Sequence, residues 1–310
     1  MGATIAACVA IVPEMAVALT REQIEAVASQ TTVVIAQGLQ KGDIEARQEW
    51  NPGSGAIVAR DGDTYYALTA YHVVQTRNVV YGIRTADGEV HIVDDVNNDD
   101  NIYPFGQRLI EADGQIRGFD LAIVKFQSDR DYPVAVMGDS ARIRQGDPLY
   151  VSGWPQPEDF DARRVRKTAA GSLNAAFPSP WNDGGYSLLY DNDTQPGMSG
   201  GPVFNNDGEL VGIHGRGRAQ QGYFCIDPEL STDNSCGMQT LHFLARAQIE
   251  GLQLSYNRPP VDDDLLEADT DGDIIEDIYE AFTFDRAALL RDTPSGGCGS
   301  LLLGEECPPQ

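Results

Sequence analysis

Between residues 57 and 213 the chain is divided into short apolar runs, and this pattern constrains the fold more than any other feature. The runs are rich in β-branched and aromatic residues, and Gly, Asn, Asp or Pro interrupts them at close intervals. Two of these interruptions contain the pairs Asp61-Gly62 and Asp207-Gly208, which strongly favour β-hairpins when apolar residues flank them. The pattern predicts an all-β protein built as a barrel or a sandwich.

The segment T-Q-P-G-M-S-G-G-P-V, from Thr194 to Val203, places Ser199 in a glycine-rich loop directly before a β-type run. A serine hydroxyl is a poor nucleophile unless a base takes its proton and nearby backbone N–H groups stabilise the oxyanion that forms. The surrounding glycines allow the backbone to fold tightly and a substrate to approach. Ser199 is therefore a candidate nucleophile.

A base and an acid precede this serine along the chain. His72 follows the hairpin that turns at Asp61-Gly62, so we expect it at the end of a strand. Asp120 stands at the head of the apolar run from 121 to 126. An acid near the core can hydrogen-bond an imidazole and fix its tautomer. The order along the chain is therefore His, Asp, Ser.

This order argues against a different serine hydrolase fold. The letters G-M-S-G-G also fit the nucleophile elbow G-x-S-x-G, in which the order is Ser, acid, His and a helix follows the serine. Here Pro202 and a second hairpin follow instead, and the late histidine, His242, lies in an apolar stretch. We therefore reject the elbow.

Three motifs, T-A-Y-H-V-V, F-D-L-A-I-V-K-F and the segment around Ser199, together resemble the chymotrypsin-like (trypsin-fold) serine peptidases. The nearest group is the bacterial trypsin-like and glutamyl endopeptidases, and the resemblance covers about residues 24–252. It implies that His72 is the general base, that Asp120 orients it and that Ser199 is the nucleophile. The backbone N–H groups of Gly197 and Ser199 would form the oxyanion hole. No cofactor is implied.

One position departs from the animal members of that family. Animal trypsins carry an Asp just before the catalytic Ser, and this Asp pairs with a new N-terminus after zymogen cleavage. This chain has Met198 there. The activation switch is therefore absent, and the oxyanion loop must be held in another way.

The resemblance implies an all-β fold of two antiparallel β-barrels of the chymotrypsin type, with an acidic, partly helical C-terminal tail. We expect a signal peptide over residues 1–20, a first barrel over 21–131, a second over 132–252 and the acidic extension over 253–310. A short amphipathic helix should precede the first strand, around residues 21–30. The active-site cleft would lie between the barrels.

Substrate preference rests on the residues around the expected pocket. In glutamyl endopeptidases, residues of the types of Thr194 and His214 bind the substrate glutamate, and hydroxyl and imidazole groups can donate hydrogen bonds to a carboxylate. Asp193, by contrast, sits where trypsins keep the acid that binds Arg or Lys. We favour cleavage after Glu or Asp, with cleavage after Arg or Lys as the alternative. The candidate substrate-binding residues are Thr194, Asp193, His214, Gly215 and Arg216.

The N-terminal residues and the cysteines both favour export. Residues 1–20 are apolar and contain an A-x-A cleavage pattern that ends at Ala18, with a buried N-terminal helix as the alternative. Cleavage there would remove Cys8 and leave four cysteines. Local pairing would give the disulfides Cys225–Cys236 and Cys298–Cys307, although spacing alone does not fix the connectivity. No zinc-type spacing is present.

Charge and hydropathy limit the partners. The net charge of −25 excludes nucleic acid, because phosphates would be repelled. No run after the first twenty residues is long enough to span a membrane. In the acidic tail, D-T-D-G-D suggests calcium, but the last ligand position of an EF-hand loop would fall on Ile278, so the loop fails. We expect a protein or peptide substrate and favour a monomer.

A second class of function stays open. The chain could be an inactive homologue, a peptide-binding or chaperone-like module on the same fold. Reaction of Ser199 with a fluorophosphonate probe distinguishes the two classes, because such a probe requires an activated serine.

Overall fold

The computed structural model describes residues 18–39, 50–76, 78–93, 101–109, 115–157, 164–177, 180–218, 233–249, 251–252 and 254–258. The first seventeen residues of the predicted signal peptide, the acidic tail beyond residue 258, and Cys8, Cys225, Cys298 and Cys307 lie outside these ranges.

The predicted first helix is confirmed as α1 (Arg21–Thr31). Thr20 and Gln23 form a capping box at its start: the Gln23 N–H donates to Thr20 Oγ1 (3.3 Å) and the Thr20 N–H donates to Gln23 Oε1 (2.8 Å). Ile24 and Ala28 point into the core from one face of the helix. The chain passes directly from α1 into the first strand, so the helix is fixed at both ends.

The first unit is a seven-stranded antiparallel sheet with the order β5-β4-β1-β2-β3-β7-β6. The β2–β3 hairpin turns at Asp61-Gly62 as predicted, and Gly62 has φ 58°, in the left-handed region that favours glycine. The strands are β1 (Thr32–Gln37), β2 (Trp50–Asp61), β3 (Thr64–Thr69), β4 (Tyr81–Arg84), β5 (Val90–Val93), β6 (Ile102–Arg108) and β7 (Ile116–Gln127).

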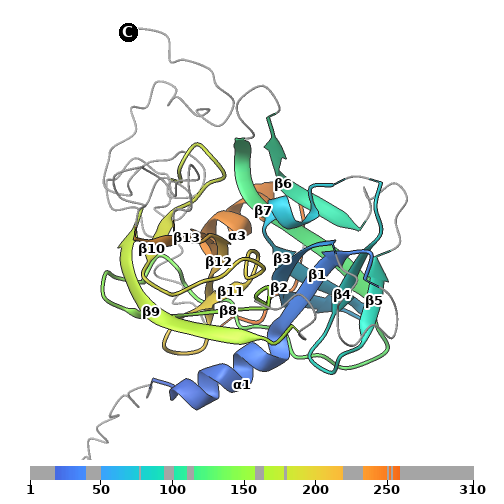
Figure 1. Ribbon diagram of the computed structural model, residues 1–310, viewed down its shortest axis with the longest axis horizontal. Helices are drawn as coiled ribbons and strands as arrows, with labels where there is room; N and C mark the ends of the chain where they lie inside the picture. The colour runs from blue at the N-terminus through green and yellow to red at the C-terminus, as the bar shows by residue number, and fades with distance from the viewer. Residues whose placement is uncertain are drawn as a thin grey trace, which may run out of the picture.

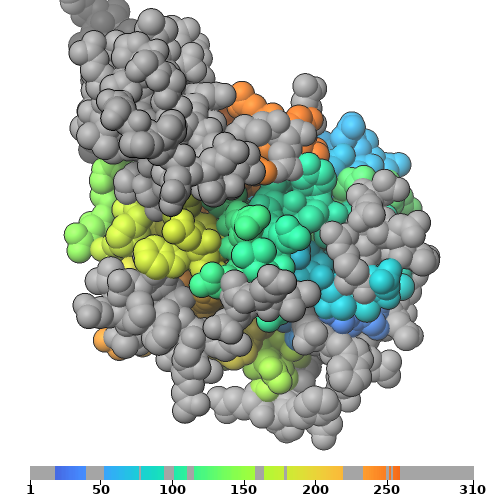
Figure 2. Space-filling model, turned by 90° about the horizontal axis from the view of Figure 1, so that it is seen from above, coloured from blue at the N-terminus to red at the C-terminus, as the bar shows by residue number. Residues whose placement is uncertain are grey.

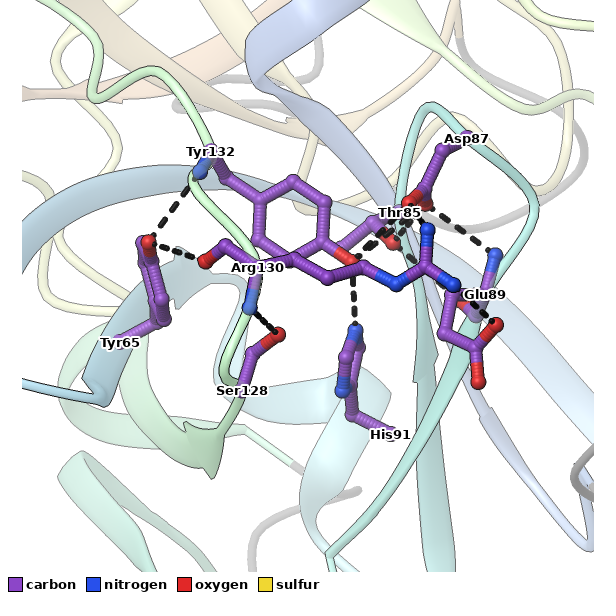
Figure 3. A network of polar contacts seen from close by, with 8 residues as sticks. All are labelled: Tyr65, Thr85, Asp87, Glu89, His91, Ser128, Arg130 and Tyr132. Atoms are coloured by element: carbon purple, nitrogen blue, oxygen red, sulfur yellow. Dashed lines mark hydrogen bonds and ion pairs between the residues drawn. The ribbon is translucent and has the colours of Figure 1, made fainter.

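This sheet curls until β5 meets the far end of β7. Figure 3 shows the polar contacts around Tyr132 at this junction. His91 on β5 joins the two, because its Nδ1 lies 3.1 Å from the carbonyl oxygen of Gln127 and its Nε2 lies 2.9 Å from the Tyr132 hydroxyl. The Tyr65 hydroxyl on β3 accepts the Tyr132 N–H (3.1 Å), and Arg130 pairs with Asp87 (3.0 Å). Polar contacts thus give the first unit a barrel-like shape.

The second unit is a closed antiparallel barrel with the order β10-β13-β12-β11-β8-β9. The second predicted hairpin is also present, with Gly208 at φ 73° in its turn. A strand and not a helix follows the Ser199 loop, which agrees with rejecting the hydrolase elbow. The strands are β8 (Pro148–Gly153), β9 (Lys167–Ala176), β10 (Leu188–Tyr190), β11 (Pro202–Phe204), β12 (Leu210–Arg216) and β13 (Ser235–Gln239).

The two units lie side by side, with α1 running below them and α3 (Thr240–Ile249) at their junction (Figure 1). One hydrophobic cluster crosses the boundary: Phe105 and Leu121 of the first unit pack with Leu189 of the second and with Phe243 of α3. The predicted all-β, two-unit architecture is therefore confirmed.

Residues 254–258 also pack on this body. Tyr256 bridges to Ala59 of β2 and its ring meets Phe243 edge-on, with centroids 5.6 Å apart. The start of the predicted acidic extension is thus held against the core. In the parts of the chain that the structure describes, no helix has both the length and the apolar character needed to cross a bilayer.

Candidate active site

His72 is positioned by a short helix that the sequence did not predict, α2 (Tyr71–Val74), which begins two residues after β3 ends. β3 pairs with β7 in a register that sets Thr69 opposite Ala122, so the chain leaving β3 runs beside residue 120. His72 Nδ1 lies 2.7 Å from Asp120 Oδ2, and the His72 backbone N–H donates to Asp120 Oδ1 (2.8 Å). Both carboxylate oxygens are therefore engaged by one residue.

Asp120 is completely buried and lies inside β7, which begins at Ile116 rather than after residue 120 as we expected. Burial alone would raise the pKa of this carboxyl. The positive charge and hydrogen bonds of His72, together with a hydrogen bond from Tyr186, more than offset that effect and lower the pKa of Asp120 below its ordinary value. Asp120 is therefore a carboxylate at neutral pH.

Ser199 lies in the loop before β11, at the seam between the two units. Its carbonyl oxygen accepts the Ser54 N–H of β2 (2.7 Å), and its Oγ donates to the Gly215 carbonyl of β12 (3.0 Å). Gly200, with φ 83°, packs so closely that a Cβ there would lie 2.9 Å from the backbone nitrogen of Ala70, which precedes α2. The Ser199 loop thus touches the segment that carries His72.

The backbone N–H groups of Gly197 and Ser199, which we expected to be the oxyanion donors, lie next to a bonded carbonyl. The Pro196 carbonyl accepts the Gln156 N–H (2.7 Å), and in a trans peptide the following N–H, that of Gly197, points the opposite way. Within the described ranges, neither the Gly197 nor the Ser199 N–H has an acceptor. Gly197 has φ 94°, and a Cβ there would lie 2.7 Å from the Trp154 carbonyl oxygen, so only glycine fits.

Ser54 links this loop to the first unit, a role that sequence reasoning missed. Its Oγ donates to the Gly197 carbonyl (2.9 Å) and accepts the Trp154 N–H (2.9 Å). These contacts fix the Ser199 loop, where Met198 is buried and carries no charge. The only sequence signal is a polar residue between two glycines, which reads as an ordinary loop.

Two predicted substrate-binding residues have polar partners inside the second barrel. His214 is buried, and its Nδ1 lies 2.7 Å from the Tyr190 hydroxyl. Burial, and then the charge of His72, lowers the pKa of His214 to about 3, so the imidazole is neutral. Thr194 Oγ1 lies 2.8 Å from Ser235 Oγ.

The other predicted pocket residues are distributed around the seam. Asp193 is exposed. Gly215 contributes the carbonyl that accepts the Ser199 hydroxyl. Arg216 pairs with Asp183 (2.8 Å).

Tyr186 is a second residue at the site that sequence reasoning missed. Its hydroxyl donates to Asp120 Oδ2 (2.5 Å), although it belongs to the second unit and Asp120 to the first. Cys236 is disulfide-bonded, and its expected partner, Cys225, lies outside the described residues. Among the described residues, no group of three or more His, Cys, Asp or Glu is arranged to hold a metal ion.

Known proteins match this chain at the level of a family, of individual relatives and of the fold. The family described as "Trypsin-like peptidase domain" matches residues 53–213, more than half of the chain. A "Probable periplasmic serine endoprotease DegP-like" of Marinomonas sp. (strain MWYL1) is 30% identical over 186 residues, which cover 60% of this chain and 34% of that protein. A "Serine protease HtrA-like" of Staphylococcus aureus (strain USA300) is 32% identical over 168 residues, covering 52% of this chain and 19% of that protein.

The chain therefore spans about a third of one of these relatives and a fifth of the other. A solved structure of an HtrA-type protease with tripeptide superposes with a TM-score of 0.52 at 19% identity. The match covers 76% of this chain and 65% of that one. This structural likeness shows that the two proteins share a fold.

Proposed function

Because this chain belongs to the trypsin-like peptidase family, we propose that it is a serine endopeptidase whose triad is His72, Asp120 and Ser199. The observation that carries the proposal is the pairing of His72 with a buried, ionised Asp120 beside the loop that holds Ser199. A carboxylate in this position keeps the imidazole proton on Nδ1 and leaves Nε2 free to act as a base.

The reaction follows from these positions. The Ser199 hydroxyl turns from the Gly215 carbonyl toward the His72 imidazole, gives up its proton and attacks the peptide carbonyl. The N–H groups of Gly197 and Ser199 hold the oxyanion, and each such donor typically contributes about 3–4 kcal/mol to the transition state. His72 then protonates the leaving amine, and water releases the acyl group by the reverse route. No oxidation or reduction takes place in this sequence of steps.

Active-site labelling tests this proposal. A fluorophosphonate probe should add one equivalent to the wild-type protein, read by intact mass, and none to Ser199→Ala. Ser199→Ala and His72→Ala should each lower kcat/KM on a peptide substrate at least about ten-thousand-fold while the circular dichroism spectrum stays unchanged. A folded wild-type protein that neither labels nor hydrolyses peptides would instead favour the peptide-binding or chaperone-like module.

We further propose a preference for Glu or Asp at the P1 position. The Thr194 hydroxyl would exchange Ser235 for the substrate carboxylate, because hydrogen bonds to a charged acceptor are stronger. A neutral His214 donates a single N–H, which at present bonds the backbone of Cys236, and the carboxylate would compete for it. The alternative, a basic P1 residue bound by Asp193, stays the second candidate because this carboxylate is exposed.

Profiling with a peptide library separates the two preferences, and pH adds a check. Because the pKa of His214 is about 3, its charge does not change between pH 5 and pH 8. KM for a Glu substrate should therefore stay constant over that range. Cleavage after Arg or Lys alone would overturn the acidic preference and assign Asp193 to the pocket.

We also propose that the protein is exported and works as a monomer on protein or peptide substrates. A disulfide at Cys236 supports an oxidising compartment, and a relative is described as periplasmic. N-terminal sequencing of the secreted form should begin after Ala18. Intact mass with and without reductant should report Cys225–Cys236 and Cys298–Cys307, and four free thiols would contradict both pairings.

A further inference from the structure

We propose that Tyr186 is a positioning residue for the triad: its hydroxyl holds the Asp120 carboxylate in the orientation that serves His72. The inference rests on the proposed peptidase function. It adds a residue that none of the sequence motifs contains.

The hydrogen bonds of Asp120 define the role. Oδ2 accepts two of them, from the Tyr186 hydroxyl (2.5 Å) and from His72 Nδ1 (2.7 Å), while Oδ1 accepts the His72 backbone N–H (2.8 Å). Burial, and then the charge of Asp120, raises the pKa of Tyr186 well above its ordinary value, so the phenol keeps its proton and donates it. With three donors in place, the carboxylate cannot rotate without losing a charge-assisted bond.

The backbone on both sides is shaped for the tyrosine ring. A Cβ at Gly215 would lie 2.3 Å from Tyr186 Cε1, and a Cβ at Gly184 would lie 2.9 Å from Cε2 and 3.2 Å from Asp120 Cβ. Gly184 also has φ 79°, which favours glycine. The ring therefore reaches Asp120 between two positions that lack side chains, and one of them, Gly215, also binds the Ser199 hydroxyl.

An ion pair between Arg216 and Asp183 covers the Tyr186 ring. The Arg216 guanidinium lies over the Tyr186 ring, 4.6 Å from its centroid, and pairs with Asp183 (2.8 Å). Asp183 in turn accepts the Ile116 N–H at the start of β7 (2.9 Å), and the Asp120 N–H donates to the Gly184 carbonyl (2.8 Å). The segment before β10 is thus bonded along β7, and Figure 2 shows the yellow surface of the second unit directly against the green surface of β6 and β7.

The rival interpretation is that Tyr186 only fills space at the seam. A filler would matter for stability but would not alter the electron density on Asp120 Oδ2, the oxygen that it shares with His72. A hydroxyl that donates to this oxygen competes with the imidazole for it, so its removal changes the His72–Asp120 bond directly. The two interpretations therefore predict different effects of removing the Tyr186 hydroxyl on the His72 Nδ1 proton resonance and on kcat.

The test compares Tyr186→Phe with the wild-type protein and with Tyr65→Phe as a matched control. Tyr65 is also completely buried, and its hydroxyl donates to the Arg130 carbonyl (2.7 Å) in the first unit, away from the triad. We expect Tyr186→Phe to lower kcat by about ten- to a hundred-fold, because hydrogen bonds to charged groups are among the stronger ones. KM should stay unchanged, because Tyr186→Phe keeps the ring that packs on Gly215 and Arg216 and removes only the hydroxyl bonded to Asp120. Tyr65→Phe should retain wild-type kcat.

A proton NMR spectrum gives the second readout. The His72 Nδ1 proton should appear at low field in the wild-type protein, shift in Tyr186→Phe and stay in place in Tyr65→Phe. If Tyr186→Phe fails to fold, site-specific 3-fluorotyrosine at position 186 keeps the ring and the hydroxyl but strengthens the donor, and it should also shift this resonance.

Two results would overturn the inference: an unmoved resonance, or a kcat for Tyr186→Phe equal to that of Tyr65→Phe. Failure of the proposed peptidase function looks different. In that case the wild-type protein itself shows no hydrolysis and no fluorophosphonate labelling, whereas the resonance still reports whether Tyr186 acts on the His72–Asp120 pair.

Discussion

The histidines of this protein differ in burial, and this difference decides whether the imidazole is available for chemistry or is part of the core. The side chain of His72 is 31% exposed and paired with a carboxylate. His242 is completely enclosed and stacks on Phe119, with ring centroids 5.3 Å apart. Among the described residues neither ring nitrogen of His242 has a hydrogen-bond partner, and burial lowers its pKa to about 3. His242 is therefore a neutral aromatic residue of the core.

Buried neutral histidines make the fold sensitive to acid. The pKa values of His214 and His242 in the folded protein, about 3, lie below the ordinary value of 6.5. The unfolded chain therefore binds more protons than the folded one below about pH 6.5. The free energy of unfolding that these neutral histidines contribute is fully present above about pH 6.5. It falls as the pH decreases toward 3, by about 1.4 kcal/mol per pH unit for each histidine.

Replacing His242 by Phe should raise stability and reduce this dependence. The change removes two unpartnered polar atoms from the core, which typically cost about 1–3 kcal/mol, and keeps the stacking on Phe119. Urea unfolding at pH 7 and pH 4.5 measures both effects. The pH-dependent loss should be smaller in His242→Phe than in the wild-type protein. An equal loss in the two proteins would show that His242 does not contribute to the acid sensitivity.

For single residues, the sequence motifs pointed to candidates that stand in recognisable segments. They missed residues whose importance depends on contacts with distant parts of the chain. His72, Asp120 and Ser199 each stand in a recognisable segment, and the predicted contact between His72 and Asp120 is present. Ser54 and Tyr186 act on partners 143 and 66 positions away. Nothing in the neighbouring residues encodes such a contact, because it depends on how the two units pack.

Among the elements, the Ser199 loop is bonded to Ser54, which lies on β2 of the other unit. Ser54→Ala should lower kcat by about ten- to a hundred-fold, because the loop loses a bond that fixes the Gly197 peptide and oxyanion donors act only when well positioned. KM should change little. Kinetics on a chromogenic peptide measure both constants.

The control is Ser128→Ala, another buried serine, whose Oγ accepts the Arg130 N–H (3.0 Å) in the first unit. A comparable loss of kcat in both variants would assign the effect to stability instead of to the loop.

Two elements at the site differ from the sequence prediction for physical reasons. β7 extends to Ile116 because its first residues pair with β6, with Arg108 opposite Ile116, although Arg117 is polar and exposed. Hydrophobic patterning does not detect a strand end that only its backbone stabilises. α2 has four residues, too few for a helical period to appear in the sequence.

For the whole molecule, the shared hydrophobic cluster predicts that the two units unfold together. Phe243 of α3 is completely buried and meets Phe105 of the first unit edge-on, with centroids 5.5 Å apart. Phe243→Ala should destabilise the protein by about 3–5 kcal/mol and keep a single transition. Far-ultraviolet circular dichroism and tryptophan fluorescence should give the same midpoint in urea.

The control for this prediction is Val80→Ala, since Val80 is 41% exposed. It should leave the midpoint nearly unchanged. Two separate transitions in Phe243→Ala would contradict the expectation and show that each unit is stable without the other.

The way the Ser199 loop is held has a consequence for when the proposed peptidase would become active. Ser54 donates to the Gly197 carbonyl and Gln156 to the Pro196 carbonyl, and the uncharged Met198 has no carboxylate with which a newly formed N-terminal amine could pair. The loop should therefore reach this arrangement as soon as the two units have packed against each other.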